Sequence, residues 1–297
     1  MSDDSKNLRA RIEELEGELQ AKEAELAQMR LRLSSANSRL EQVIDRVSHE
    51  VKLAAQIQKL LCPVELPHIS GFEFSTKFIP GSKSGGDYFD IFEHEDKMRF
   101  GIVLSSCSGY TMSALFLSIL MKLSSKIEAR RGWPPHETVQ SMAREILPSI
   151  KESDSASVWY GIVDRRTFEL SYCSVGDVCA LHQIFGQDHL GRLPTQGPLL
   201  SKEFNTELQS ARVSLNPKDR LVLCSPGLWR APSRNGEAWS EDAVREAVRA
   251  APRQGFHEVR NEILYRNESF TGTSEPDRDQ TVLVLEVKDK VIKLAKQ

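Results

Sequence analysis

The chain has 297 residues, of which 40% are hydrophobic and 27% charged, and its formal net charge is −3 at pH 7. This length fits one sizeable domain with an accessory element, or two small domains. The near balance of charge excludes a dominant basic patch, so the composition predicts no nucleic-acid partner. The acidic first residues lack a following apolar core, and no apolar run approaches the ~18 residues of a bilayer span. We therefore expect a cytoplasmic protein without a membrane partner.

The cysteines support that expectation. They form no Cys-x-x-Cys pair and their number is odd, whereas zinc ribbons and disulfide frameworks depend on paired cysteines. We expect reduced thiols at Cys62, Cys107, Cys173, Cys179 and Cys224.

A heptad pattern runs through the first part of the chain. Apolar residues recur at alternating steps of four and three, without proline, and only Lys22 and Glu50 break the series. This period is typical of a coiled-coil seam, because a surface helix repeats every 3.6 residues. The seam consists of Leu8, Ile12, Leu15, Leu19, Lys22, Leu26, Met29, Leu33, Ala36, Leu40, Val43, Val47, Glu50, Ala54, Ile57 and Leu61.

A single helix of this kind would expose its seam to water, so the pattern predicts a homodimer through a coiled coil over residues 1–62. The flanking charges do not decide between parallel and antiparallel helices. The alternative is one long amphipathic helix that folds back on its own domain.

Two prolines, Pro63 and Pro67, end the helix, because proline cannot continue it and disfavours helix in the preceding residue. We expect a linker over residues 63–70, a domain over residues 71–288 and a tail over residues 289–297. Alternating or apolar runs predict strands at 72–78, 98–104, 158–163, 168–173, 220–224 and 281–287. Helical patterns predict helices at 112–130, 135–147, 241–250 and 256–266. Strand groups separated by helix pairs indicate an α+β layered domain.

Three short segments carry most of the information about function. Residues 85–90 read Gly-Gly-Asp-Tyr-Phe-Asp, residues 105–110 read Ser-Ser-Cys-Ser-Gly-Tyr, and residues 218–227 read Lys-Asp-Arg-Leu-Val-Leu-Cys-Ser-Pro-Gly. Their order resembles the PPM family of metal-dependent serine/threonine phosphatases, in its SpoIIE/RsbU branch. The resemblance covers about residues 55–287 and implies an α-β-β-α sandwich preceded by the coiled-coil helix.

The same resemblance implies a centre of two Mn²⁺ or Mg²⁺ ions held by aspartates, with a bridging water that attacks phosphorus. Hard divalent cations prefer oxygen ligands and lower the pKa of bound water. Asp87 falls at the first ligand position of the family. At the other three positions Ser106 replaces the bridging aspartate, Pro226 replaces the aspartate of Thr-Asp-Gly, and Arg278 replaces the first aspartate of Asp-Asp-x-Thr. A shift of one residue would bring Asp277 or Asp279 there instead, but the register to Thr281 argues against it.

Because divalent affinity follows the number and charge of the ligands, we expect no catalytic residue and no cofactor. The sequence then predicts a pseudophosphatase that binds a protein signalling partner. One alternative is an active phosphatase that holds a single Mn²⁺ or Mg²⁺ ion with Asp87, Asp90 and Asp279. A second alternative is a structural coiled-coil scaffold. Without a metal ion, Asp87 would cap its own turn, and Asp90 would be an outer-sphere or surface carboxylate.

Overall fold

The computed structural model describes residues 3–63, 65–82, 85–108, 111–187, 190–252 and 255–288. The predicted tail at 289–297, and Gly109 and Tyr110 of the second motif, lie outside these ranges. The chain forms two compact units, Met1–Lys52 and Leu53–Gln297. Within the described ranges, no helix combines the length and the apolar composition that crossing a bilayer requires.

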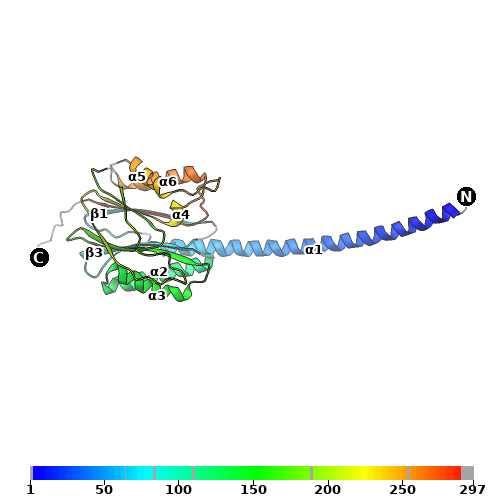
Figure 1. Ribbon diagram of the computed structural model, residues 1–297, viewed down its shortest axis with the longest axis horizontal. Coiled ribbons are helices and arrows are strands. Elements are labelled where there is room, and N and C mark those ends of the chain that lie inside the picture. The colour runs from blue at the N-terminus through cyan, green and yellow to red at the C-terminus, as the bar shows by residue number, and fades with distance from the viewer. Residues whose placement is uncertain are drawn as a thin grey trace. The chain divides into compact units, whose positions relative to one another are not determined.

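The first unit consists of most of helix α1 (Asp3–Leu61), which contains no proline (Figure 1). Its large apolar seam residues are roughly half exposed in the single chain, from 47% at Leu15 to 63% at Leu33. The helix is therefore formed as predicted, and within this unit the seam has no covering element.

The second unit is built on two antiparallel sheets of five strands each. The first sheet has the strand order β1-β10-β9-β6-β7, and the second has the order β2-β3-β4-β5-β8. The strands of the first sheet are β1 (Phe72–Ile79), β10 (Gln280–Val287), β9 (Arg220–Cys224), β6 (Cys179–Gln183) and β7 (Leu190–Arg192). Those of the second sheet are β2 (Asp87–Glu93), β3 (Arg99–Ser108), β4 (Ser155–Asp164), β5 (Glu169–Val175) and β8 (Ala211–Ser214).

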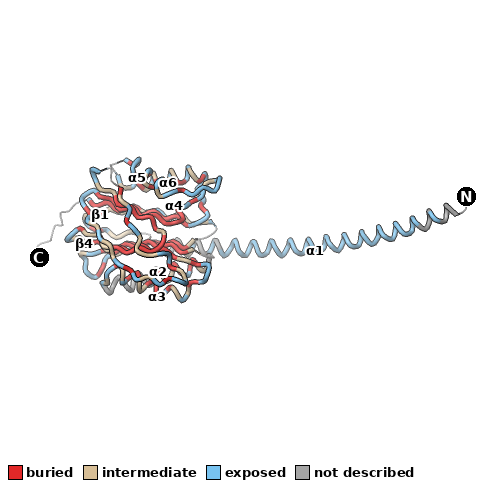
Figure 2. Tube along the Cα trace, viewed as in Figure 1, coloured by how far each residue is buried: buried red, intermediate tan, exposed pale blue. Residues whose placement is uncertain are grey.

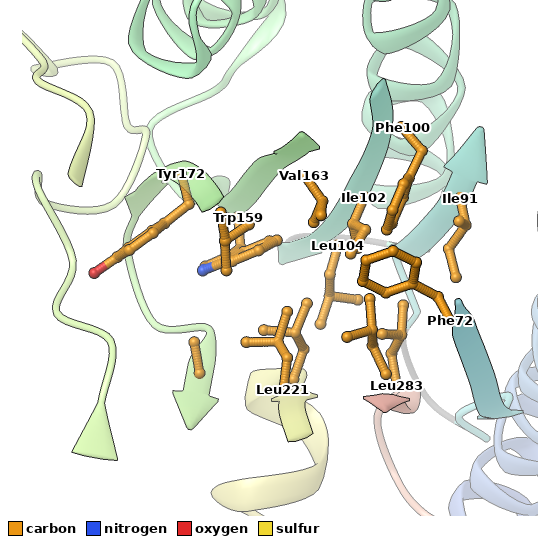
Figure 3. Packing of buried hydrophobic residues seen from close by; sticks show 14 of the residues in the cluster. Phe72, Ile91, Phe100, Ile102, Leu104, Trp159, Val163, Tyr172, Leu221 and Leu283 are labelled. Carbon is orange, nitrogen blue, oxygen red and sulfur yellow. The ribbon is translucent and has the colours of Figure 1, made fainter. Parts of the chain in front are cut away.

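The two sheets face each other across a shared apolar core. Alternate residues of each strand point into it, because successive side chains of a strand lie on opposite faces. Figure 3 shows Ile102, Leu104 and Trp159 of the second sheet pointing toward Leu221 and Leu283 of the first. All five side chains are fully buried.

Helices cover the outer faces of both sheets (Figures 1 and 2). Helices α2 (Thr111–Arg131) and α3 (Pro135–Ile146) share an apolar cluster with β3 and β4. Helices α5 (Glu241–Ala250) and α6 (Phe256–Thr271) share another with β9 and β10. A 3₁₀ turn η1 (Leu147–Ser149) follows α3, and a short helix α4 (Pro226–Trp229) follows β9. The result is the predicted α-β-β-α sandwich.

Every helix and strand predicted within the second unit is present, and most have shifted ends. Strand β3 continues to Ser108 because residues 105–108 pair with β4, and α6 continues to Thr271, where Gly272 adopts the left-handed conformation that ends helices. Strands β2, β6, β7 and β8 were not predicted. Strands β7 and β8 are short and carry mostly small or polar residues, and their pairing depends on neighbouring strands.

The last turn of α1 belongs to the second unit and is fastened to it. The Nζ of Lys122 on α2 donates a hydrogen bond to the carbonyl oxygen of Leu61 at 2.6 Å, and Cys62 is buried in the core between the sheets. The helix end is thereby fixed against the elements that surround the first motif.

Candidate functional site

Asp87, the retained family position, is the first residue of β2 and only 1% exposed. It shares the face of β2 that carries Phe89 and Ile91, so it points into the space between the two sheets. Its Oδ2 accepts a hydrogen bond from Oγ1 of Thr281 on β10 at 2.8 Å. The side chain therefore joins the two sheets and does not cap its own turn.

Asp279 lies next to Asp87. It is 3% exposed, and its Oδ2 accepts a hydrogen bond from the backbone amide of Asp87 at 3.1 Å. Its Oδ1 accepts from the amide of Gly81 at 2.7 Å. The sequence register favoured Arg278 at this position, but Arg278 is exposed. Alternation explains the difference, because Asp279 and Thr281 share the face of Leu283 that points between the sheets.

Hydroxyl groups from two other motif segments lie beside the carboxyl group of Asp87. Ser106 of β3 pairs with Asp87 across the β2–β3 ladder. Ser225 follows β9, and its Oγ accepts a hydrogen bond from the amide of Thr281 at 3.0 Å. Pro226, the predicted degenerate position, is buried as the first residue of α4. The structure thus brings Asp87 and Ser106 together with Ser225 and Asp279, which are the chain neighbours of Pro226 and Arg278.

Three motif glycines allow this close approach. A Cβ atom at Gly85 would overlap the carboxylate of Asp279, and one at Gly227 would overlap the carbonyl oxygen of Asp279. A Cβ at Gly86 would overlap the carbonyl oxygen of Cys107. The glycines are therefore needed because backbone and carboxylate groups occupy the space of a side chain.

Burial dominates the electrostatics of the pair. It raises the pKa of Asp87, against the effect of the hydroxyls of Ser106, Ser225 and Thr281 and of the positive charge of Arg278. Burial and, second, the charge of Asp87 raise the pKa of Asp279 to about 8. Desolvation and a like neighbouring charge both disfavour the ionised form of a carboxyl group. Both carboxyl groups therefore hold a proton to higher pH than an exposed aspartate does.

Asp90 is buried but belongs to another environment. Its Oδ2 accepts a hydrogen bond from the hydroxyl of Tyr88 at 3.0 Å, and its Oδ1 accepts from the amide of Ile91 at 2.8 Å. It lies three positions after Asp87 in the same strand, so the two side chains lie on opposite faces of the sheet. The structure does not bring Asp87, Asp90 and Asp279 together, and Asp90 is not a surface carboxylate.

The cysteines are free and buried. Burial raises the pKa of the thiols of Cys62, Cys107, Cys173, Cys179 and Cys224, so each thiol is protonated at neutral pH. A buried protonated thiol is an inert side chain.

The side chains at the site do not fit the two-metal centre that the fold family implies. Among the described residues, no group of three His, Cys, Asp or Glu side chains is placed to hold a metal ion. Mn²⁺ and Mg²⁺ require several oxygen ligands, whereas both oxygens of Asp279 and one of Asp87 accept hydrogen bonds from the protein. Ser106 adds a neutral hydroxyl and Pro226 no ligand atom.

Sequence reasoning named Asp279 only as an alternative to Arg278, and it missed Ser225 as a member of the site. The alternation of the adjoining strands points to both residues once it is known which face of each strand lies between the sheets. Counting back in steps of two from the apolar residues of β10 leads to Thr281 and Asp279, and counting forward along β9 leads to Ser225. Alignment to the family motif was less accurate, because it assigns positions without regard to the face of the strand on which a side chain lies.

Comparisons with known proteins agree with this architecture. A family model described as stage II sporulation protein E (SpoIIE) matches residues 96–288, which is more than half of the chain. The matched range begins after Asp87. No curated protein sequence matches the chain.

Three solved structures share the fold at low sequence identity. The SiaA-PP2C domain of Pseudomonas aeruginosa has a TM-score of 0.66 at 16% identity, over 82% of this chain and 98% of that one. The RsbU and RsbW domains of Rv1364c from Mycobacterium tuberculosis have a TM-score of 0.64 at 17% identity, over 77% of this chain. The PP2C phosphatase domain of SpoIIE from Bacillus subtilis, with a fragment of its regulatory domain, has a TM-score of 0.62 at 15% identity, over 73% of this chain.

The chain spans 65% of the length of the M. tuberculosis structure and 63% of that of the B. subtilis structure. Likeness at these identities concerns the fold alone. The family assignment comes from the matched SpoIIE model, and the two-sheet sandwich with its motif loops at one end agrees with it. The chain belongs to the SpoIIE family and has the PPM-type (PP2C-like) phosphatase fold.

Proposed function

We propose that this protein is a pseudophosphatase, a SpoIIE-family domain that binds a signalling partner protein without hydrolysing phosphoserine. The observation that carries the proposal is the set of hydrogen bonds around Asp87 and Asp279 between the sheets, a place that we call the carboxylate corner. There, Asp87 accepts from Thr281 and Asp279 accepts from two backbone amides. These carboxyl groups fasten β2, β10 and the loop at Gly81 to one another, which is a structural role.

The chemistry of the corner supports the same proposal. Metal-dependent hydrolysis needs ions that lower the pKa of a bound water and neutralise the phosphoryl oxygens. Burial that raises the pKa of a carboxyl group makes it a poorer ligand, because metals bind the deprotonated form. The chain retains the fold of the family, and the surface of this fold can bind a partner protein.

A second candidate function is an active phosphatase that uses one ion. The observation in its favour is the proximity of Asp279 to Asp87, which restores a second carboxyl group to the site. This candidate requires that an ion displace the hydrogen bonds that both carboxyl groups accept. It predicts measurable Mn²⁺ affinity, whereas the pseudophosphatase proposal predicts none tighter than millimolar.

Titration calorimetry of Mn²⁺ into the full-length protein separates the two candidates. We expect no binding heat up to millimolar Mn²⁺ and no release of phosphate from a phosphoserine peptide. The matched variants are Asp87→Asn and Asp242→Asn, since the side chain of Asp242 on α5 is 91% exposed. Micromolar binding that Asp87→Asn abolishes and Asp242→Asn retains, together with phosphate release, would establish the active enzyme instead.

We also propose that the protein is a homodimer through a coiled coil formed by α1. The half-exposed apolar seam supports this, because burying it against a second helix gains roughly 25 cal/mol for each Å² of apolar surface. The seam residues follow the 3.5-residue period from Leu8 to Leu61.

Two double substitutions test the dimer. Leu19→Asp with Leu26→Asp places charges in the seam, whereas Ala24→Asp with Leu31→Asp places them on the opposite side of the same helix segment. We expect wild type and the second variant to have twice the 33.5 kDa mass of one chain in light scattering. The seam variant is expected to have the mass of one chain, since buried unpaired charges are strongly disfavoured. Equal masses for the two variants would contradict the proposal.

A further inference from the structure

A cavity of about 440 Å³ adjoins the carboxylate corner, within the second unit. Its walls come from α4 and the segment after it, and from the loop between α6 and β10. Gly227 and Gln280 belong to these walls, and a Cβ at Gly227 would meet the backbone of Asp279. The volume lies in the range of small-molecule sites, roughly 300–1,000 Å³.

Three arginines line the cavity: Arg230, Arg234 and Arg278. Among the described residues that line it, Asp277 is the single acidic one. The excess of positive charge is local, because the whole chain has a net charge of −3. Such a cavity attracts an anion.

Arg230 is held in place by two contacts. Its Nη1 lies 3.0 Å from Oδ2 of Asp177, and its guanidinium lies 4.5 Å from the ring centre of Trp229. The indole Nε1 of Trp229 in turn donates to the carbonyl oxygen of Asp177 at 2.7 Å. A guanidinium has five N–H donors, so the ion pair leaves others for a ligand while it fixes the orientation of the group.

Arg234 and Arg278 complete the cationic wall. Nη2 of Arg234 donates to the carbonyl oxygen of Gly272 at 3.1 Å, which fastens it to the end of α6. Arg278 is exposed, and no described residue forms a hydrogen bond or an ion pair with its side chain. Two of the three arginines therefore contact the protein through their guanidinium groups, and the guanidinium of Arg278 is available to a ligand.

We propose that this arginine-lined cavity binds a phosphoryl group. Guanidinium groups match the oxygens of a phosphoryl group in pairs of parallel hydrogen bonds. A phosphoryl group carries close to two negative charges and three acceptor oxygens, which suits three guanidiniums better than a single carboxylate does. Recognition of this kind needs no metal ion.

Two sources supply that chemistry, free inorganic phosphate and the phosphoserine side chain of a partner protein. The phosphoserine source rests on the proposed function, whereas phosphate binding by the arginines goes beyond it. Calorimetry in the presence of EDTA compares three probes: inorganic phosphate, the tripeptide Ala-phosphoserine-Ala and its unphosphorylated form. The test variants are Arg234→Gln with Arg278→Gln, and the control is Arg166→Gln with Arg212→Gln, which removes two surface arginines outside the cavity.

We expect both phosphorylated probes to bind to the wild type and the unphosphorylated tripeptide not to bind. The test variant is expected to weaken binding at least tenfold, and the control variant to leave it unchanged. Binding of phosphate without the tripeptide would support the site with the free anion as ligand. Absence of binding, or equal binding to both variants, would overturn the inference. Failure of the proposed function is detected separately, by Mn²⁺ binding in the absence of EDTA.

Discussion

Replacing Gly227 by alanine is expected to lower the free energy of unfolding of the second unit by about 3 kcal/mol. The new Cβ would overlap the backbone carbonyl oxygen of Asp279 and approach Cβ of Arg278 to 3.2 Å. Backbone cannot move aside as the end of a flexible side chain can. The melting temperature is expected to fall by roughly 6–12 °C, since 1 kcal/mol shifts a domain of this size by roughly 2–4 °C.

Gly17 provides the control, because a Cβ there would meet nothing within 4 Å. Gly17→Ala lies within α1, where alanine favours helix more than glycine does, by about 1 kcal/mol. We expect this variant to retain or slightly raise the stability. Equal melting temperatures for Gly227→Ala and wild type in scanning calorimetry would show that the close packing around Asp279 is not required.

Replacing Asp279 by asparagine is expected to flatten the dependence of stability on pH. The pKa of Asp279 is raised from 3.8 to about 8 by burial and by the neighbouring Asp87. Between these values the folded protein keeps a proton that the unfolded chain releases, so the free energy of unfolding falls as the pH rises from 4 to 8. Each unit of raised pKa corresponds to a loss on the order of 1 kcal/mol across this range.

The variant removes the titrating group and also the like charge beside Asp87, so both effects flatten the profile. Urea unfolding at pH 4.5, 6 and 7.5 measures the slope for wild type, Asp279→Asn and the exposed control Asp242→Asn. The control is expected to follow wild type. The absolute stability of Asp279→Asn also reflects the lost acceptor for the amide of Asp87, so the slope is the decisive quantity. The same slope in all three proteins would contradict the raised pKa.

Most elements of the fold could be predicted from local sequence. The heptad period defined α1, two prolines marked its end, and runs of alternating or apolar residues located β1, β3, β4, β5, β9 and β10. These features depend on neighbours within a few residues, and local chain geometry makes them visible in the sequence. Strand β8 was not predicted, because the alternation in Ala-Arg-Val-Ser is too short and its partner strand β5 lies far away in the sequence.

The candidate site divides in the same way. The sequence by itself determined that the first motif keeps Asp87 and that the residues at Ser106, Pro226 and Arg278 are not carboxylates. Only the tertiary structure decided that Asp279 and Ser225 face the corner while Arg278 lines a cavity of arginines. The physical reason is that the corner forms where β2, β3, β9 and β10 from two sheets meet. Packing between the sheets decides on which face of a strand a side chain lies. The alignment of a motif carries no information about this packing.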